Sequence, residues 1–547
     1  MATAAKQRIV VLGGGFAGVY TALHLCQLNK RRGDLEVFLV NRENYFCFQP
    51  LLPEIISGNI GILDTVSPLH RLVPDARLYV REVQAIDLGK KVVSLSPGFR
   101  PRETLLPYDH LVLALGTVTD FRGSPGLYEH ALPFKNLADA LRLRNHLIRV
   151  LEEASIEPDP ALRKQLLTFV VAGGGWSGVE VVAELNDFIR NACRQYRSIS
   201  RHDIEVILIH SGERILEREV SEGLGKYAQR LLEKRGVKIL LKRRLASASP
   251  DAAVLADGMR ISTGTLVSTV PSSPHPLLET LQLPKERGKI VCDGTLQVVG
   301  SEHLWAAGDC ALVPSRGEEK YCPPTAQHAV RQAQTIAHNI VARIDGRALR
   351  TFDFTGLGKM GALGSRRAIA ELAGGLKLSG VLAWFMWRTV YWMKLPGLDR
   401  KIKLAMSWAL DFFLPPDYVQ LKTGGSKGVS QIHYESGEEV FHQGDLGDAL
   451  YVVLSGEVEV VLHEPAGEHV VCRLGAGEYF GELALLQHRP RSATVRCTQA
   501  TTLLALPKAD FQALAMSLPQ LRSDFDRVAA ARGVPTSSSL TDTCPET

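Results

Sequence analysis

Two segments of the chain share one pattern, in which a short apolar run leads into three consecutive glycines, a further glycine and a helical periodicity. They are RIVVLGGGFAGVYTALHL at residues 8–25 and LLTFVVAGGGWSGVEVVAEL at residues 166–185. A strand, a G-x-G-x-x-G loop and a helix in this order form a dinucleotide-binding unit, because the loop admits a pyrophosphate and the helix N-terminus attracts its charge. Further apolar strands at 110–116, 204–210 and 303–309 predict a doubly wound, parallel α/β fold.

Each loop supplies three glycines with distinct roles in the turn, the phosphate approach and the helix packing. They are Gly13, Gly15 and Gly18 in the first loop, and Gly173, Gly175 and Gly178 in the second. An acidic residue usually follows the second strand of such a unit and accepts a hydrogen bond from a ribose. After residues 36–40 this chain has Asn41, which can still bind a ribose hydroxyl without a charge.

Length and composition indicate a globular protein whose two ends differ in charge. The 547 residues suffice for three or four domains, and 45% hydrophobic with 22% charged residues exclude a wholly disordered, collagenous or multi-pass membrane chain. The net charge of +5 divides into +13 for residues 1–429, −6 for 430–532 and −2 for 533–547. Without a clustered basic patch, no nucleic-acid partner is expected.

Nine scattered cysteines without a C-x-x-C pair indicate reduced thiols in a cytosolic compartment. We therefore expect neither a disulfide framework nor a metal site. The stretch 376–416 holds four of the six tryptophans and six basic residues, but no apolar run in it reaches the ~18 residues of a spanning helix. Its composition favours amphipathic helices in the headgroup region of an anionic membrane. The alternative is burial against the rest of the chain or a dimer mate.

Several motifs in order, NRENYFCFQPLLPEIISG (41–58), LALGTVTDFRG (113–123), AAGDC (306–310) and PPTAQ (323–327), together with the two loops, resemble the type II NADH dehydrogenases. These single-subunit flavoproteins pass a hydride from NAD(P)H to FAD and then electrons to a membrane quinone, without pumping protons. The resemblance covers about residues 8–420. It implies FAD as cofactor, a quinone partner, a homodimer and peripheral attachment to the cytoplasmic face of a membrane.

The same resemblance assigns further residues. FAD would be bound by the first loop and by Asn41, Gly116, Gly308 and Asp309, and the nicotinamide dinucleotide by the second loop, His210 and Arg214. His210 stands where NADH-selective members have an acid, so NADH and NADPH both remain open. Glu180 and Gln327 are the expected catalytic residues on the acceptor path, and Glu184 is expected to be structural. Arg331 replaces a family glutamine and would bring a charge near the quinone.

The C-terminal region changes to short alternating strands separated by glycine turns, which predicts a small antiparallel barrel or jelly roll. GEEVFHQGDLGDALYVVLSGEVEVV (437–461) and FGELALLQHRPRSATV (480–495) resemble the cyclic nucleotide-binding domain. The implied ligand site comprises Gly481, Glu482, Leu483, Ala484, Arg491, Ser492 and Ala493. In this site the glutamate accepts from the ribose and the arginine neutralises the phosphate. Serine after the arginine favours cAMP, with cGMP as the alternative.

These observations predict two Rossmann-like dinucleotide-binding domains, amphipathic C-terminal helices and a β jelly-roll cyclic nucleotide-binding domain. The expected boundaries are 1–120 and 286–350 for FAD binding, 121–285 for NAD(P)H binding, 351–422 for membrane association, 423–429 for a linker, 430–532 for cyclic nucleotide binding and 533–547 for a disordered tail. The expected function is a NAD(P)H:quinone oxidoreductase regulated by cyclic nucleotide. The alternatives are a flavoprotein reductase of a soluble acceptor, and a sensor or scaffold whose catalytic activity has decayed.

Overall fold

The computed structural model divides into two compact units, residues 1–420 and 421–547. It describes residues 6–96, 104–121, 124–270, 272–316, 320–364, 366–410, 418–421, 430–445, 447, 449–464, 467–486, 490–507 and 511. The predicted linker at 423–429 and tail at 533–547 lie outside these residues.

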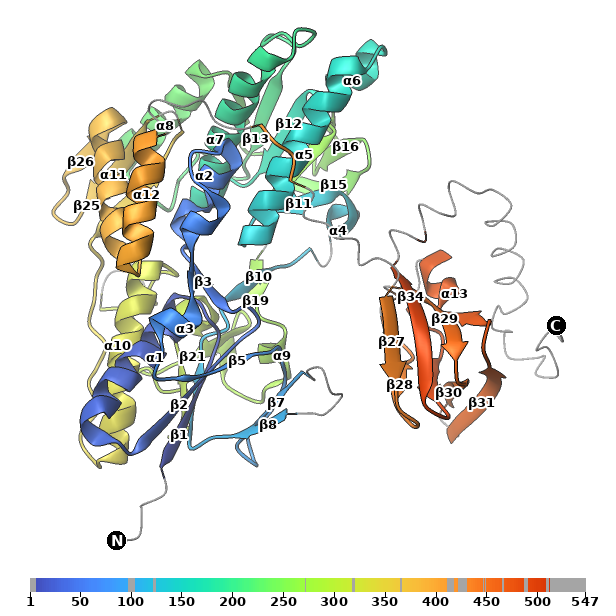
Figure 1. Ribbon diagram of the computed structural model, residues 1–547. Helices are drawn as coiled ribbons and strands as arrows, with labels where there is room; N and C mark the ends of the chain where they lie inside the picture. The colour runs from blue at the N-terminus through green and yellow to red at the C-terminus, as the bar shows by residue number, and fades with distance from the viewer. Residues whose placement is uncertain are drawn as a thin grey trace. The chain divides into compact units, whose positions relative to one another are not determined.

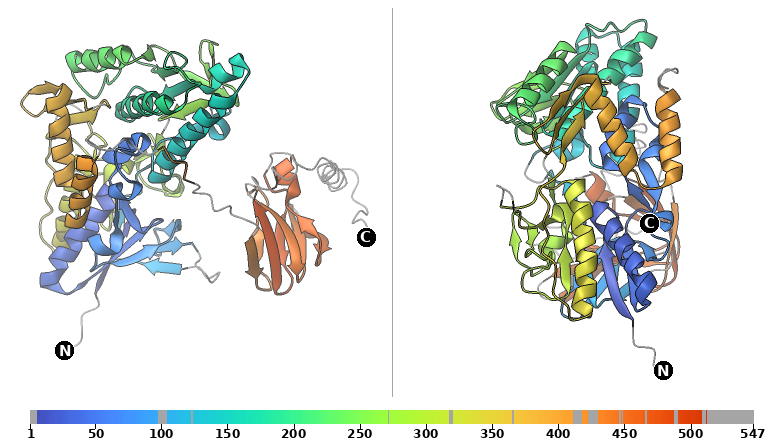
Figure 2. Two further views of the ribbon diagram at one scale, coloured as in Figure 1. Left: turned by 45° about the horizontal axis from the view of Figure 1, so that its top comes forward. Right: turned by 90° about the vertical axis from the view of Figure 1, so that its left-hand side faces the viewer.

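The first dinucleotide-binding unit is built on a five-stranded parallel sheet. Its order is β22 (Leu304–Ala306), β9 (His110–Leu113), β1 (Gln7–Leu12), β2 (Leu35–Asn41) and β5 (Arg77–Val80). The run Ile9–Leu12 of β1 is fully buried, as expected for a strand covered on both faces. Helices α1 (Phe16–Arg32) and α10 (Ala326–Ile344), far apart in sequence, lie side by side against this sheet (Figures 1 and 2).

The second unit repeats this arrangement with another five-stranded parallel sheet, which confirms the predicted doubly wound fold. Its order is β11 (Ala131–Pro133), β18 (Thr265–Ser268), β12 (Thr168–Ala172), β13 (Glu205–Ile209) and β14 (Val237–Leu240). Its helices are α5 (Leu137–Ile156), α6 (Pro160–Leu166), α7 (Trp176–Ala192) and α8 (Glu222–Lys234). Helix α7 follows β12 through the second glycine loop, as α1 follows β1 through the first.

Shorter elements complete this part of the chain. The helices are α2 (Leu52–Ser57), α3 (Leu69–Leu72), α4 (Leu127–His130) and α9 (Leu277–Thr280). The strands are β3 (Tyr45–Cys47), β4 (Val66–Pro68), β6 (Val83–Asp87), β7 (Val92–Leu95), β8 (Thr104–Pro107), β10 (Thr117–Thr119), β15 (Leu245–Ser249), β16 (Ala252–Leu255), β17 (Arg260–Ser262), β19 (Ser272–Pro274), β20 (Lys285–Glu286), β21 (Lys289–Val291) and β23 (Ala311–Leu312).

After α10, the chain forms a three-stranded antiparallel sheet and two helices. They are β24 (Gly358–Ala362), β25 (Ala368–Leu372), β26 (Lys377–Ser379), α11 (Gly380–Lys394) and α12 (Leu398–Leu410). Helices α11 and α12 stand next to each other (Figures 1 and 2), and Trp384, Trp387 and Trp408 point into the core that they share with both Rossmann-like units. No helix in the described ranges is long and apolar enough to cross a membrane.

The C-terminal unit consists of two four-stranded antiparallel sheets. One has the order β27 (Ser430–Tyr434), β34 (Thr501–Pro507), β29 (Ala449–Ser455) and β32 (Tyr479–Phe480). The other has the order β28 (Glu439–Phe441), β33 (Thr494–Cys497), β30 (Val458–Glu464) and β31 (Gly467–Leu474). Buried side chains of both sheets, including Val453, Val458 and Leu503, form one core. A short helix, α13 (Glu482–Leu486), follows β32.

Candidate functional site

The first glycine loop leaves a backbone cradle open between β1 and α1. Gly13 has a φ of +110°, and a Cβ atom there would lie 2.2 Å from the carbonyl oxygen of Ala114. A Cβ atom on Gly18 would lie 1.8 Å from the carbonyl oxygen of Gly13, whereas one on Gly15 would meet nothing within 4 Å. The free space over Gly15, at a helix N-terminus without a side-chain cap, fits the pyrophosphate of FAD.

The second loop has the same backbone but less open space. Gly173 has a φ of +120°, and its Cβ atom would lie 2.2 Å from Oγ1 of Thr269. A Cβ atom on Gly178 would again lie 1.8 Å from the oxygen of the first glycine, and one on Gly175 would lie 2.9 Å from Oε1 of Glu219. A dinucleotide phosphate at this loop therefore has a carboxylate close by, which is absent from the space over Gly15 among the residues described.

A side chain at the end of the second strand of each dinucleotide-binding unit accepts a hydrogen bond from the glycine loop; Asn41 is the last residue of β2, and His210 directly follows β13. The backbone N–H of Gly14 donates to Oδ1 of Asn41 at 2.8 Å, and that of Gly174 donates to Nδ1 of His210 at 3.2 Å. Because Nδ1 of His210 accepts, Nε2 carries the proton of the neutral ring. Burial lowers the pKa of His210, although the charges of Glu219 and Glu217 oppose this shift.

The two side chains expected beside the nicotinamide dinucleotide, Arg214 and His210, differ in whether they are free to bind it. The guanidinium of Arg214 donates to the carbonyl oxygens of Leu216, Glu217 and Val220 within its own loop, at 2.9 to 3.0 Å. Arg214 thus shapes the loop after β13. Nε2 of His210 is buried and has no hydrogen-bond partner among the described residues. His210 is therefore the better placed of the two to meet a ribose or its phosphate.

Gly116 and Asp309 come together at the carboxyl ends of β9 and β22. Gly116 has a φ of +68° and open space where a Cβ atom would lie. Gly308 has a φ of +73°, and its N–H donates to Oε1 of Gln332 at 2.9 Å. Burial raises the pKa of Asp309, and Lys135, whose Nζ lies 3.9 Å from Oδ2, opposes the shift. No sequence signal singled out Lys135, because it precedes α5 and lies 174 residues from its partner in the chain.

Glu180 and Gln327 lie at opposite ends of β24. Oε1 of Glu180 accepts the N–H of Ala362 at 3.1 Å. The amide of Gln327 accepts from the N–H of Leu357 at 3.0 Å and donates to the carbonyl oxygen of Gly358 at 3.1 Å. Gly358 and Ala362 are the first and last residues of β24. Four residue steps separate them, which corresponds to about 13 Å at the usual rise of a strand. The side chain of Gln327 thus fixes the start of β24, and the two residues do not form one constellation.

Arg331 does not present an isolated charge. Its guanidinium carbon lies 3.9 Å from the centre of the Phe354 ring, and Nη1 donates to the carbonyl oxygen of Gln327 at 3.0 Å. Stacking on an aromatic ring and a carbonyl partner satisfy part of the guanidinium locally. The arginine in place of a family glutamine is therefore accommodated by its own helix and by Phe354.

A series of aromatic rings connects the first glycine loop with α11. Phe16, the first residue of α1, lies 5.0 Å from Phe46 and 5.7 Å from Phe48 between ring centres. Phe48 lies 5.9 Å from Tyr391, which lies 5.0 Å from Trp387. Tyr391 is near Glu180, whose charge adds to burial in raising the pKa of the phenol. This apolar wall suits an aromatic head-group. Its members lie in three segments noted in the sequence, 8–25, 41–58 and 376–416, but no sequence pattern indicated that these rings lie together.

In the C-terminal unit, the residues expected at the cyclic nucleotide gather around α13. Glu482 and Arg491 are buried, at 2% and 3% exposure, and Ser492 is exposed. Arg491 donates from Nη1 to the carbonyl oxygen of Gly481 and from Nη2 to that of Ala449, both at 2.8 Å. Its guanidinium also lies 4.0 Å from the ring centre of Phe441. The arginine is thus held inside the unit by backbone carbonyls and an aromatic ring.

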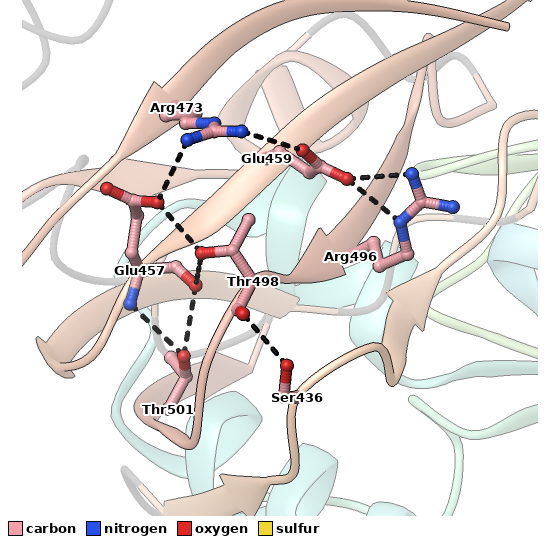
Figure 3. A network of polar contacts seen from close by, with 7 residues as sticks. All are labelled: Ser436, Glu457, Glu459, Arg473, Arg496, Thr498 and Thr501. Carbon is pink, nitrogen blue, oxygen red and sulfur yellow. Dashed lines mark hydrogen bonds and ion pairs between the residues drawn. The ribbon is translucent and has the colours of Figure 1, made fainter.

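A polar network joins strands of the C-terminal unit (Figure 3). Oε1 of Glu459 on β30 accepts from Nε and Nη2 of Arg496 on β33, at 2.9 and 2.7 Å. Arg473 on β31 lies 3.8 Å from both Glu459 and Glu457. Hydroxyls of Thr498 and Thr501 donate to the carbonyl oxygen of Glu457 at 3.1 Å. Since β33 begins three residues after Arg491, this network stabilises the strand that follows Arg491.

Comparison with known families accounts for nearly the whole described chain. The family model for pyridine nucleotide-disulphide oxidoreductases matches residues 7–333, that for the NDH2 C-terminal domain matches residues 357–414, and that for the cyclic nucleotide-binding domain matches residues 431–517. The three matches follow one another in the order predicted from the sequence.

Individual relatives agree. The chain is 31% identical over 414 residues to demethylphylloquinone reductase NdbB of Synechocystis sp., which covers 74% of this chain and 96% of that protein. It is 27% identical to type II NADH:quinone oxidoreductase NdhA of Mycobacterium tuberculosis, over 75% and 88% of the two chains. NDH2 of Plasmodium falciparum, solved in complex with NADH, shares the fold at a TM-score of 0.70 and 19% identity, over 76% of this chain and all of that one. The chain therefore belongs to the pyridine nucleotide-disulphide oxidoreductases, as a type II NADH dehydrogenase that carries a C-terminal cyclic nucleotide-binding domain.

Proposed function

We propose that this chain oxidises NAD(P)H through bound FAD and passes the electron pair to a quinone. The single observation that carries the proposal is the duplicated glycine cradle, which provides two dinucleotide sites in one compact unit. When bound, FAD supplies a carrier that takes a hydride and releases electrons. The protein's own contribution is to orient both dinucleotides, to exclude water and to hold protons at nearby carboxyl groups.

The two cradles divide the work between them. The open space over Gly15 and the partly exposed Asp309 fit the FAD pyrophosphate and ribityl chain, and the second cradle is left for the nicotinamide dinucleotide. We propose that His210 lies at the adenosine ribose, where its Nε2–H takes the place of a carboxylate; the bond from the Gly174 N–H to Nδ1 supports this protonation of the ring. A neutral N–H can donate to either a 2′-hydroxyl or a 2′-phosphate, so we propose that both NADH and NADPH are used.

The quinone is proposed to approach along the aromatic wall formed by Phe16, Phe46, Phe48, Tyr391 and Trp387. That wall leads to α11, whose outer face, with that of α12, is largely apolar. The exposed apolar side chains of the two helices are Val381, Leu382, Phe385, Trp392, Met393, Leu398, Ile402, Met406 and Leu410. Exposed Lys394 and Lys403 border them. Apolar side chains bordered by cations suit the headgroup layer of an acidic lipid membrane, where a quinone is dissolved.

An anaerobic titration of the purified full chain tests this function. We expect a yellow protein that is bleached by NADH and by NADPH, and re-oxidised by a quinone analogue in liposomes. A colourless protein, or a flavin that neither nucleotide bleaches, would contradict the enzyme and favour a sensor with decayed catalysis. Rapid re-oxidation by a soluble dye without any by quinone would instead indicate a reductase of a soluble acceptor.

We also propose that the C-terminal unit binds a cyclic nucleotide, with cAMP favoured by Ser492. Glu482 is the first residue of α13, and Arg491 donates to the carbonyl oxygen of the preceding Gly481. A charge-assisted contact from each of these side chains to the nucleotide would contribute about 1.5–3 kcal/mol. Regulation requires that the ligand bind two states of the protein with different affinity. Calorimetric binding of cAMP and cGMP, combined with kcat, KM and liposome binding at saturation, tests both steps. Unchanged values with a bound ligand would leave binding in place and refute regulation.

A further inference from the structure

A cavity of about 250 Å³ lies within residues 1–420, where α2, α7 and α11 meet the turn between β24 and β25. Its wall includes the charged and polar side chains of Glu54, Ser57, Glu184, Asp187, Arg366 and Arg388. Asn191 and Arg366, which also line it, are exposed at the surface. Since each water molecule takes about 30 Å³ in the liquid, the cavity has room for several waters between the surface and its buried end.

Glu184 lies at the buried end. It is 3% exposed, and Oε2 has no hydrogen-bond partner among the described residues. Burial raises the pKa of Glu184 to about 8, and the charge of Glu54 adds to this shift, while Ser57, Arg235 and Arg388 oppose it. An unsatisfied carboxyl oxygen beside a cavity is a binding position for water, because burial without a partner costs free energy.

Glu180 stands one turn earlier on the same face of α7. Residues four apart on a helix are neighbours, with Cβ atoms about 6 Å apart. Burial raises the pKa of Glu180 to about 8; the N–H of Ala362 opposes the shift and the charge of Glu54 adds to it. Tyr391, a member of the aromatic wall, lies close enough to Glu180 for the carboxylate charge to raise the pKa of its phenol. Two protonated carboxyl groups therefore follow each other from the cavity toward the proposed quinone approach.

Glu54 has a different role, because it is fixed by partners. Its Oε2 accepts the indole N–H of Trp408 at 2.8 Å, and its Oε1 lies 3.6 Å from Nη2 of Arg388. The Arg388 guanidinium in turn lies 4.2 Å and 4.6 Å from the ring centres of Trp384 and Trp408. The ion pair sets the local field, and Asp187 at the cavity wall is likewise paired, with Arg235. Among the described carboxyl groups that line the cavity, Glu184 is the one with a buried oxygen that lacks a hydrogen-bond partner.

The overall reaction requires a proton from solvent. Oxidation of NAD(P)H delivers one hydride, whereas reduction of a quinone to its quinol takes two electrons and two protons, so one proton per turnover must come from water. We propose that Glu184 relays this proton from the cavity to Glu180, from which it reaches the quinone oxygen. Glu180 first gives its own proton to the quinone oxygen. The O–H bond of Glu184 then breaks as that of Glu180 re-forms, and water in the cavity returns a proton to Glu184. This inference rests on the proposed function.

The test separates the two half-reactions by stopped flow in the full-length holoprotein. For Glu184→Gln we expect flavin reduction by NADH to stay within twofold of the unchanged chain and re-oxidation by a quinone analogue to slow at least tenfold. Glu184→Asp should recover most of the rate, because it keeps a carboxyl group. Glu153→Gln, which removes an exposed carboxylate from α5, is the matched control and should leave both half-reactions unchanged.

Two further measurements distinguish a relay from a packing role. Formate or azide should restore quinone reduction in Glu184→Ala, because a small acid can occupy the enlarged cavity and carry the proton. In infrared difference spectra, the carboxyl C=O absorption that disappears near pH 8 should lose the contribution of Glu184 in Glu184→Gln and keep that of Glu180. Equal slowing of both half-reactions without chemical rescue, or a quinone half-reaction unaffected by Glu184→Gln, would overturn the relay.

The proposed function and the relay fail in different ways. If the unaltered chain is bleached by NADH but never re-oxidised by quinone, the proposed acceptor is wrong. The contribution of Glu184 to the infrared absorption still decides whether Glu184 holds a proton at neutral pH, and its absence overturns the relay independently of any turnover.

Discussion

Replacement of Glu184 by glutamine should change how the stability of residues 1–420 depends on pH. In the folded chain burial raises the pKa of Glu184 to about 8, from 4.5 for the free side chain. The unfolded chain therefore releases the proton first as pH rises, and the free energy of unfolding falls by about 1.4 kcal/mol per pH unit between these two values. Below about pH 4.5 the carboxyl is neutral in both states and contributes no pH dependence.

The magnitude follows directly. Between about pH 5 and pH 8 the native glutamate loses roughly 4 kcal/mol of stability that a neutral glutamine does not lose. We therefore expect Glu184→Gln to gain roughly 4 kcal/mol over the native sequence on going from pH 5 to pH 8, whatever their offset at pH 5. Glu180 has the same raised pKa, so a residual slope should remain in the variant.

Urea unfolding followed by tryptophan fluorescence is a suitable assay. All six tryptophans lie before residue 409, so their fluorescence reports on residues 1–420 and not on the C-terminal unit. Both proteins are compared at saturating FAD, so that cofactor loss does not enter the difference. Glu153→Gln serves as the control and should run parallel to the native sequence. The free energies of unfolding of Glu184→Gln and of the native chain should diverge from pH 5 to pH 8. If the two curves stay parallel within about 1 kcal/mol over this range, a protonated, buried Glu184 is refuted.

Three other changes test separate parts of the molecule. His210→Glu should lower the ratio of kcat/KM for NADPH over NADH at least tenfold, because a carboxylate then faces the 2′-phosphate; an unchanged ratio in initial-rate assays would remove His210 from the ribose site. Arg491→Gln should weaken cAMP binding about 10- to 150-fold in calorimetry, the equivalent of a lost contact of 1.5–3 kcal/mol; equal affinity would mean that the arginine stays on its carbonyls. The pair Leu382→Glu and Ile402→Glu should abolish sedimentation with acidic vesicles while dye reduction persists; loss of a dimer with intact vesicle binding would show that a second copy covers this face.

The parts of the site that sequence could predict are those in which the requirement is local. Gly13 and Gly173 need a positive φ, and the motif encodes that need within six residues. Asn41 and His210 were predicted to lie at a ribose from their place after a strand. Their hydrogen bonds to the loops were not predicted, because an amide and an imidazole were not expected to replace each other as acceptors.

Other features arise from contacts between distant segments, for which no local pattern exists. Glu54 and Arg388 are separated by more than 300 residues, and each belonged to a different motif. Glu184 was expected to be structural, because its spacing from Glu180 shows a shared helix face but not the cavity in front of it. The role of Gln327 depends on a strand, β24, that packs back onto its helix. The cradles were therefore predictable from the sequence, whereas the contacts around Glu184 and Gln327 depend on the folded chain.

The ion pair of Glu54 also ties the surface helices to the buried carboxyl groups. Arg388 belongs to α11 and Trp408 to α12, and both hold Glu54, whose charge raises the proton affinity of Glu180 and Glu184. Any force that separates these helices from α2 weakens the field of Glu54 at the two carboxyl groups. By linkage, a change in the protonation of Glu180 or Glu184 must in turn change the free energy of that separation. The positions of α11 and α12 thus affect the electrostatic field at Glu180 and Glu184. A lipid surface that moves these helices would change the proton affinity of the two buried carboxyl groups.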